Sequence, residues 1–357
     1  MAYYGIDLGT TYSTIAFIDE HGATNLIPNS YGNLTTPSVV YFETGNNIVV
    51  GEKAKEAAWF DPSRAVSFVK QQMCNRDWAF EIDGKSYDPM MISAFIIRLL
   101  IGDAKQLGHD VKDVVITCPP CFGEEERCRT RKAGQLVGLN VVAILDEPVA
   151  AAINYGLNGD AKGKNVIVYD LGGCTFDVTV VKIGDHTDRN EICVISTDGT
   201  HTLGGNDWDD RIVQYYLQEF ANQIGSNIDL LSDVETAWEL HIGAERDKMI
   251  LTAKESVMRR IRYESEITRI ELTRAKFGEL TEDLLEETFV LTDRVIEDAK
   301  KKGIAEIDSF LLVGGSTRMP QVRERIHEKY GIEPAICPDG VVAKGAARYA
   351  AMLDTLG

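Results

Sequence analysis

An apolar run that ends in Asp-Leu-Gly, turns through small residues and enters a second apolar run occurs twice in this chain. The first copy contains Asp7 and the second contains Asp170, so each copy opens a segment long enough to be a separate lobe. A single turn of this kind is common between strands. Two copies at this separation predict a duplicated α/β fold with a cleft between its halves.

Each of these turns can hold phosphate groups. Gly and Thr at the tip of a hairpin expose backbone N–H groups without side-chain bulk, and the Thr hydroxyls add further donors. An aspartate in front of each tip repels a phosphate unless a cation lies between them, and Mg²⁺ with its bound waters provides that cation. Asp7 and Asp170 therefore predict a clamp for a magnesium nucleotide. The sequence has no Gly-x-x-x-x-Gly-Lys-Ser/Thr loop and no Gly-x-Gly-x-x-Gly after its first strand.

The composition restricts the partners and the compartment. A formal charge of −18 over 357 residues provides no long-range attraction to nucleic acid. No segment approaches the roughly 20 apolar residues that cross a membrane, and the N-terminus does not resemble a secretory signal. Seven scattered cysteines fit a reducing compartment better than a disulfide framework. We expect a cytoplasmic protein that binds neither nucleic acid nor membrane.

Short apolar runs alternate with amphipathic helical stretches, which is typical of an α/β protein. Asp88 can cap a helix that has Pro89 in its first turn and Gly108 at its end. The expected strands lie at residues 3–7, 12–18, 114–117, 141–145, 166–170, 176–181 and 310–313. The other expected helices lie at residues 208–224, 233–260, 276–301 and 341–353.

Two later segments add candidate site residues. An apolar strand ends at Gly314 and Gly315, whose backbone can approach a base or a phosphate closely, and Arg318 can stack on a base. By itself this segment also fits an ordinary turn from strand to helix. A second strand delivers Glu147 at its end and continues into a helix of small residues. Such a helix can pack closely against another helix, as a hinge between lobes requires.

Five segments spread along the chain resemble the ATPase domain of the seventy-kilodalton heat-shock (DnaK-type) chaperones. These chaperones belong to the superfamily that also contains actin and the sugar kinases. The segments are residues 5–13, 146–157, 203–209, 313–320 and 338–347. The resemblance implies an actin-like ATPase fold of two duplicated, mixed-sheet lobes with ATP in the cleft between them. We expect lobe I at residues 1–160, lobe II at 161–338, a C-terminal helix at 339–357 that packs back at the hinge, and no peptide-binding domain in this chain.

The resemblance also implies roles for single residues. Asp7 and Asp170 correspond to residues that hold Mg²⁺, largely through water, and Asp177 to a ligand of a monovalent cation such as K⁺. The residues that correspond to catalytic groups are Lys70, Glu147, Asp170 and Thr175. The residues that correspond to nucleotide contacts are Gly9, Thr10, Thr11, Tyr12, Gly172, Gly173, Cys174, Gly204, Gly205, Glu255, Met258, Arg259, Arg262, Gly314, Gly315, Ser316, Arg318 and Asp339.

Three residues depart from the pattern of the family. Cys174 stands where the second phosphate loop has its third glycine, and Met258 and Arg262 stand where Lys and Ser are usual on a helix beside the adenine. Met258 cannot donate the hydrogen bonds of a lysine. We therefore expect weaker binding of the nucleotide and looser selectivity for adenine than a Met258→Lys variant would show.

The resulting expectation is a slow, Mg²⁺-dependent ATPase whose hydrolysis of ATP to ADP and phosphate drives lobe closure in a molecular chaperone. Its implied partners are a J-type co-chaperone and a nucleotide-exchange factor, and peptide clients would need a further domain. The alternative is a nucleotide-gated binding or regulatory module with little or no hydrolysis, which the three departures would explain. A sugar-type kinase or an actin-like filament is disfavoured, because the sequence lacks their inserted substrate segments.

Two further signals do not change this reading. Cys118 and Cys121 have the Cys-x-x-Cys spacing of a redox pair, but the family has a non-redox string at this place. The six histidines show no spacing typical of metal ligands.

Overall fold

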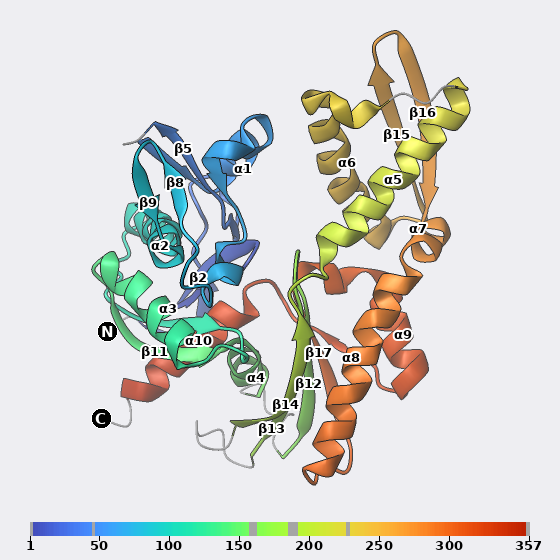
Figure 1. The fold of residues 1–357 in the computed structure, drawn as a ribbon. Coiled ribbons are helices and arrows are strands. Elements are labelled where there is room, and N and C mark those ends of the chain that lie inside the picture. The colour runs from blue at the N-terminus through green and yellow to red at the C-terminus, as the bar shows by residue number, and fades with distance from the viewer. Residues whose placement is uncertain (1–2, 45–46, 157–162, 185–191, 226–228, 355–357) are drawn as a thin grey trace.

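Two mixed sheets form the frame of the molecule in the computed structural model, which describes residues 3–44, 47–156, 163–184, 192–225 and 229–354 (Figure 1). The first sheet has the strand order β11-β10-β1-β2-β3, with β4 paired to β2, and the second has the order β14-β13-β12-β17-β18. The predicted lobe boundary at 160/161, Leu157, the first two residues and residues 355–357 lie outside the described residues.

The strands of the first sheet are β1 Tyr4–Asp7, β2 Tyr12–Ile18, β3 Thr24–Leu26, β4 Thr36–Pro37, β10 Asp113–Cys118 and β11 Asn140–Asp146. Those of the second are β12 Asn165–Leu171, β13 Phe176–Ile183, β14 Ile192–Thr200, β17 Ser309–Val313 and β18 Ala335–Ile336. The predicted fold class and all seven predicted strands are confirmed. The two sheets share one plan: β1–β2 and β12–β13 are antiparallel hairpins, and the first strand of each hairpin also pairs with a parallel strand.

The helices pack on these two sheets or on smaller ones. They are α1 Glu52–Phe60, α2 Pro89–Gln106, α3 Glu124–Leu136, α4 Glu147–Gly156, α5 Gly205–Ile224, α6 Val234–Ala253, α7 Arg274–Leu280, α8 Glu282–Lys301, α9 Pro320–Tyr330 and α10 Val341–Asp354. The start of α2 is as predicted, because the Asp88 carboxylate accepts a hydrogen bond from Met91 N at 2.7 Å. Gly108 follows this helix with a φ of +89°, a conformation that glycine tolerates. No helix in the described part of the chain is long and apolar enough to cross a membrane.

Shorter elements lie on both halves. The 3₁₀ turns are η1 Pro62–Arg64, η2 Val69–Gln72, η4 Leu230–Ser232 and η5 Gly315–Arg318. The short strands beside the first sheet are β5 Val40–Thr44, β6 Asn47–Val50, β7 Ala65–Val66, β8 Phe80–Ile82 and β9 Lys85–Tyr87. On the other half, β15 Ser256–Tyr263 and β16 Glu266–Thr273 form a separate antiparallel hairpin.

The predicted helix at 233–260 is wrong beyond Ala253, where the chain enters strand β15. Arg and Met are good helix formers, but every second residue from Val257 onward packs inward, and Ile261 is buried. The pairing of β15 with β16 overrides the local helix propensity. The predicted helix at 276–301 is also interrupted. The buried Thr281 separates α7 from α8, and its hydroxyl donates to Phe277 O at 2.8 Å.

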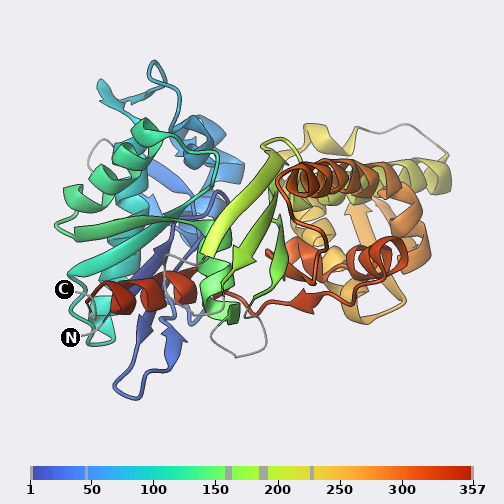
Figure 2. The ribbon, with the colours of Figure 1, turned by 90° about the horizontal axis from the view of Figure 1, so that it is seen from below.

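The two halves are joined by a central core that contains α4 and α10. Val115 of the first sheet, Val168 of the second, and residues of both helices belong to this single apolar cluster. In Figure 2, α10 crosses the first sheet, and α4 lies between the first sheet and the second. The contact between the helices is close, because a Cβ placed on Gly345 would lie 1.8 Å from Ala150 O. The predicted close packing of the alanine-rich helix is therefore confirmed.

Candidate functional site

The tips of the two Asp-Leu-Gly hairpins face each other. A Cβ added to Gly173 in the second tip would lie 2.7 Å from the Thr11 hydroxyl oxygen in the first tip. In the first tip, a Cβ on Gly9 would lie 2.0 Å from Tyr12 O, so only glycine fits there. The Thr11 hydroxyl is buried between the two tips. Opposed tips that expose backbone N–H groups fit the binding of an oxygen-rich anion such as a polyphosphate.

Four carboxylates and one lysine lie beneath these tips. Asp7 lies opposite Thr14 in the last pair of the first hairpin, and Asp170 lies opposite Asp177 in the second-to-last pair of the second hairpin. Glu147 begins α4 at the end of β11, and Lys70 is buried in η2. The Oε1 of Glu147 lies 2.5 Å from the Nζ of Lys70. Thr117 of β10 donates to Asp7 Oδ1 at 3.2 Å. The structure therefore brings together Lys70, Glu147 and the three aspartates, which come from four separate segments of the chain.

Burial and mutual repulsion make these carboxylates weak acids. Burial, followed by the charge of Glu147, raises the pKa of Asp7 to about 7 and that of Asp177 to about 7. The same two causes raise the pKa of Asp170 well above its ordinary value. Burial opposes the charge of Lys70, but Glu147 and then Asp7 outweigh it and raise the pKa of the lysine. When ionised, the buried cluster carries more negative than positive charge. A bound cation would stabilise the ionised carboxylates.

The donor set fits a cation held through water. Within the described residues, no three His, Cys, Asp or Glu side chains are close enough to ligate one metal ion. Mg²⁺ loses its waters reluctantly and commonly keeps several of them. Asp7 and Asp170 are placed to accept hydrogen bonds from such waters, and Asp177 adds a third carboxylate beside them.

The second tip is held by the start of α5 and by η5. Gly205 N donates to Gly172 O at 2.9 Å, Asn206 N donates to Gly173 O at 2.7 Å, and Ser316 Oγ donates to Gly172 O at 3.0 Å. Gly204 touches the Cys174 backbone, since a Cβ there would lie 2.4 Å from Cys174 N. These contacts gather Gly172, Gly173, Cys174, Gly204, Gly205 and Ser316 into one surface.

Cys174 occupies the second tip as a neutral thiol. Burial raises its pKa to about 11, and its sulfur accepts a hydrogen bond from Asn206 Nδ2 at 3.1 Å. Its φ is not positive, so the backbone at this position does not require glycine. Burial likewise raises the pKa of Cys118 to about 12 and that of Cys121 to about 11, and both thiols are free.

The four residues predicted on the adenine side lie apart from this surface. Glu255 follows α6 and pairs with Arg274 at 2.5 Å, while Met258 and Arg262 are exposed on β15. Arg259 turns inward, and its Nη2 lies 2.6 Å from Oδ1 of the buried Asp247. The expected helical row of base contacts is wrong because α6 ends at Ala253. The weaker nucleotide affinity expected from Met258 and Arg262 loses its basis.

Helix α6 instead presents two charged residues that the linear sequence did not distinguish. Lys248 is buried and donates to Gly205 O at 2.6 Å and to Asp209 Oδ2 at 2.8 Å. Glu245, one turn earlier, accepts from Lys55 Nζ at 3.2 Å and from the Tyr12 hydroxyl at 3.3 Å. Tyr12 and Lys55 belong to the first half, so Glu245 joins the two halves across the cleft. In the sequence, the spacing of Glu245 and Lys248 within a helix that ends at Ala253 is the signal that could have identified these two residues.

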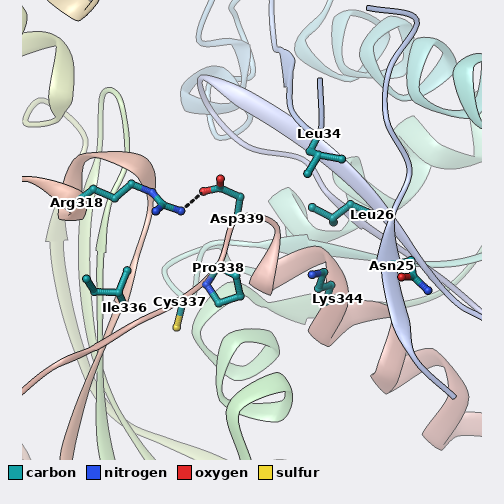
Figure 3. A pocket seen from close by; sticks show the side chains of 9 residues that line it. All are labelled: Asn25, Leu26, Leu34, Arg318, Ile336, Cys337, Pro338, Asp339 and Lys344. Carbon is teal, nitrogen blue, oxygen red and sulfur yellow. Dashed lines mark hydrogen bonds and ion pairs between the residues drawn. The ribbon is translucent and has the colours of Figure 1, made fainter. Parts of the chain in front are cut away.

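Arg318 and Asp339 lie at a pocket of about 600 Å³ between the two halves (Figure 3). Arg318 Nη2 is 2.7 Å from Asp339 Oδ1, and the two side chains point toward each other. Leu26 and Leu34 of the first half line the opposite side. Next to this pair, Gly314 has a φ of +85° and packs on Leu171 O, and nothing lies within 4 Å of a Cβ on Gly315. A planar base can approach here.

The chain is similar to known proteins along nearly all of its length. A family model described as "Hsp70 protein" matches residues 3–356. The chaperone protein DnaK of Thermosipho melanesiensis is 41% identical over 358 residues, which covers 98% of this chain and 59% of the relative. The chaperone protein DnaK of Thermotoga maritima is 41% identical over 367 residues, with coverages of 98% and 59%. The chain thus spans about three fifths of the length of these relatives.

Proposed function

Because the chain belongs to the Hsp70 family, we propose that it binds Mg-ATP between its two sheets and hydrolyses it slowly to ADP and phosphate. Hydrolysis would drive lobe closure in a heat-shock-type chaperone. The observation that carries this proposal is the pair of opposed hairpin tips above the cluster of Lys70 and four carboxylates. Such a cluster needs a cation, and such tips need an anion, and Mg-ATP supplies both.

In this proposal the tips donate backbone N–H groups to the phosphates. The first tip contributes Gly9, Thr10, Thr11 and Tyr12, and the second contributes Gly172, Gly173 and Cys174. Gly204, Gly205, Gly314, Gly315, Ser316, Arg318 and Asp339 line the side of the nucleoside. Lobe I is residues 1–160, lobe II is residues 161–338, and the helix from residue 339 forms the hinge together with α4.

We assign the catalytic roles as the resemblance to the family implies. Asp170 and Thr175 position the attacking water, and Glu147 accepts its proton as the new P–O bond forms and the bond to the oxygen that leaves with ADP breaks. Lys70, fixed by Glu147 at 2.5 Å, places a positive charge where the transferring phosphoryl group carries negative charge. Bound Mg²⁺ would neutralise phosphate charge, with Asp7 and Asp170 holding its waters. Asp177 would hold K⁺.

The remaining assignments concern partners and cellular location. Peptide clients, a J-type co-chaperone, a nucleotide-exchange factor and a cytoplasmic location are proposed from the family. The alternative of a nucleotide-gated module with little hydrolysis was based on Cys174, Met258 and Arg262. Two of these three lie on β15 outside the site, while Lys70 and Glu147 are in place, so hydrolysis is the better-supported function.

We predict that ATP and ADP bind at full strength only with Mg²⁺, and that the stabilisation by Mg-ATP increases with pH. The folded pKa of Asp7 and Asp177 is about 7, against an ordinary value of 3.8. Between these values the folded state holds more protons than the unfolded state, so the cation-free protein loses stability as pH rises toward 7. A cation binds the ionised carboxylates and offsets this loss.

Calorimetry with Mg²⁺ or with chelator measures how far the nucleotide affinity depends on Mg²⁺. Thermal unfolding at about pH 6 and about pH 8, with and without Mg-ATP, measures the stabilisation by Mg-ATP. The increase in Tm should be larger at the higher pH. Equal nucleotide affinity in chelator would contradict the clamp. A pH-independent increase in Tm would show that these carboxylates do not sense the cation.

Cys174 offers a chemical probe of the phosphate position. Alkylation of its thiol should slow when Mg-ATP binds, because the sulfur lies in the second tip, and the Cys174→Gly variant should keep or improve nucleotide binding. Peptide mapping follows this cysteine separately from the exposed Cys193, which serves as the control. Protection of Cys193 together with unchanged labelling of Cys174 would place the phosphates elsewhere.

A further inference from the structure

The backbone takes an unfavourable conformation at Phe68, two residues before Lys70. Phe68 has a φ of +58° and a ψ of +27°, which is the left-handed conformation. In the described part of the chain, the other non-glycine residues with a positive φ are Asp83 and Glu264. Both lie in the two-residue turns of hairpins, where such a φ is usual. Phe68 lies in no hairpin turn, and its Cβ crowds the following carbonyl in this conformation.

This turn in the backbone sends the next three side chains in different directions. Val69 is buried in the apolar core of the first half together with Val66. Lys70 is buried against Glu147, with 2.5 Å between Nζ and Oε1. Gln71 reaches the second half, where its Nε2 donates to His201 O at 2.8 Å. The short turn η2 therefore contacts the core, the carboxylate cluster and the opposite half.

The turn η2 is only weakly stabilised by its own backbone. Gln71 N donates to Phe68 O at 3.0 Å, and Met73 N donates to Lys70 O at 3.2 Å. Hydrogen bonds of a 3₁₀ turn have poorer geometry than those of an α-helix. The positive φ of Phe68 favours unwinding, because a phenylalanine is more stable at negative φ. Within the described chain, Gln71 is the one residue of η2 that forms a hydrogen bond with the second half.

Backbone strain of this kind occurs preferentially at functional sites and persists only where neighbouring contacts enforce it. We propose that Gln71 is a positioning residue for hydrolysis. Its hydrogen bond to His201 O keeps η2 wound against the strain at Phe68, and the wound turn holds the Lys70 ammonium at the transferring phosphoryl group. The role of Gln71 rests on the proposed ATPase function and adds that contact between the two halves controls the placement of Lys70.

A role of Gln71 in merely joining the halves has different consequences. Lys55 and Glu245 also join the halves, and neither belongs to η2. If Gln71 acts only in this way, the effect of losing it does not depend on the backbone at position 68. If Gln71 acts by keeping η2 wound, glycine at position 68 should replace it, because glycine adopts positive φ as readily as negative φ. Alanine lacks this freedom, so it separates the backbone effect from the loss of the ring.

The test measures the effect of Gln71→Ala in four backgrounds: the parent chain, Phe68→Gly, Phe68→Ala and Lys70→Ala. Single-turnover hydrolysis gives the rate, and calorimetry gives the nucleotide affinity. Hydrogen–deuterium exchange of residues 69–75 reports whether η2 is wound. Gln72→Ala is the matched control, since Gln72 has the same side chain in the same turn, and its amide forms no hydrogen bond in the described chain.

We expect Gln71→Ala to slow hydrolysis roughly tenfold in the parent chain, because small displacements of a group at the reacting centre cost rates of at least this size. Nucleotide affinity should change little, and exchange of residues 69–75 should increase. The loss of rate should shrink to roughly threefold or less in the Phe68→Gly background and stay complete with Phe68→Ala. In the Lys70→Ala background, Gln71→Ala should cause no further loss. Gln72→Ala should behave like the parent chain.

Unchanged hydrolysis in Gln71→Ala, an equal loss in all four backgrounds, or an equal effect of Gln72→Ala would each overturn the role of Gln71. Absence of hydrolysis in the parent chain would overturn the ATPase function instead. Exchange of residues 69–75 needs no hydrolysis, so unchanged exchange in Gln71→Ala would refute the hold of Gln71 on η2 in either case.

Discussion

Replacing Lys70 with alanine is expected to slow ATP hydrolysis on the order of 100-fold or more while nucleotide affinity changes little. The Nζ of Lys70 is buried and lies 2.5 Å from Glu147 Oε1, among carboxylates rather than beside the pocket at Arg318. A contact to the transferring phosphoryl group strengthens as negative charge shifts in the transition state, so its loss affects the rate more than the binding. Single-turnover hydrolysis and calorimetry measure the two quantities separately.

Two further variants make this expectation specific. Glu147→Gln keeps the shape of the side chain but removes the carboxylate that takes the proton, and should also slow hydrolysis with little effect on binding. Lys112→Ala removes an exposed lysine that pairs with Asp110, and should behave like the parent protein. Normal turnover in Lys70→Ala would show that the catalytic role of this lysine is assigned wrongly. An equal loss of rate and affinity would show that it binds the ground state instead.

Replacing Gly345 with alanine is expected to lower the free energy of unfolding by about 3 kcal/mol, the upper part of the usual range for overpacking. The added Cβ would lie 1.8 Å from Ala150 O, and backbone cannot move aside as a flexible side chain can. Because α4 and α10 form the core shared by both sheets, the loss should appear in the unfolding of the whole molecule. Urea denaturation measures it.

Gly102 provides the matched control, since it also lies inside a helix, α2, and nothing stands within 4 Å of a Cβ placed there. Gly102→Ala should stabilise the protein by up to about 1 kcal/mol through helix propensity. If both substitutions have the same effect, the crossing of α4 and α10 is looser than the structure shows. In the proposed mechanism this crossing is the hinge, so Gly345→Ala should also impair hydrolysis.

The amino-acid sequence by itself determined the duplicated α/β plan and the location of the tips. The turns at Asp7 and Asp170 combine an aspartate, glycines and flanking apolar strands within a few residues, so their conformation depends on local chemistry. The cap at Asp88 is local in the same sense. The hairpins and the cap form between residues that are close in the sequence, and the structure confirms them.

Tertiary structure decided the elements whose conformation depends on distant residues. Residues 256–260 have the composition of a helix but form a strand, because β16 supplies hydrogen-bonding partners and the core receives every second side chain. Lys70 becomes distinctive only when η2 buries it against Glu147, 77 residues away in the sequence. Lys248 and Glu245 acquire partners from other helices or the opposite half in the same way. Burial and charge pairing are properties of the folded arrangement, and no periodicity in the chain encodes them.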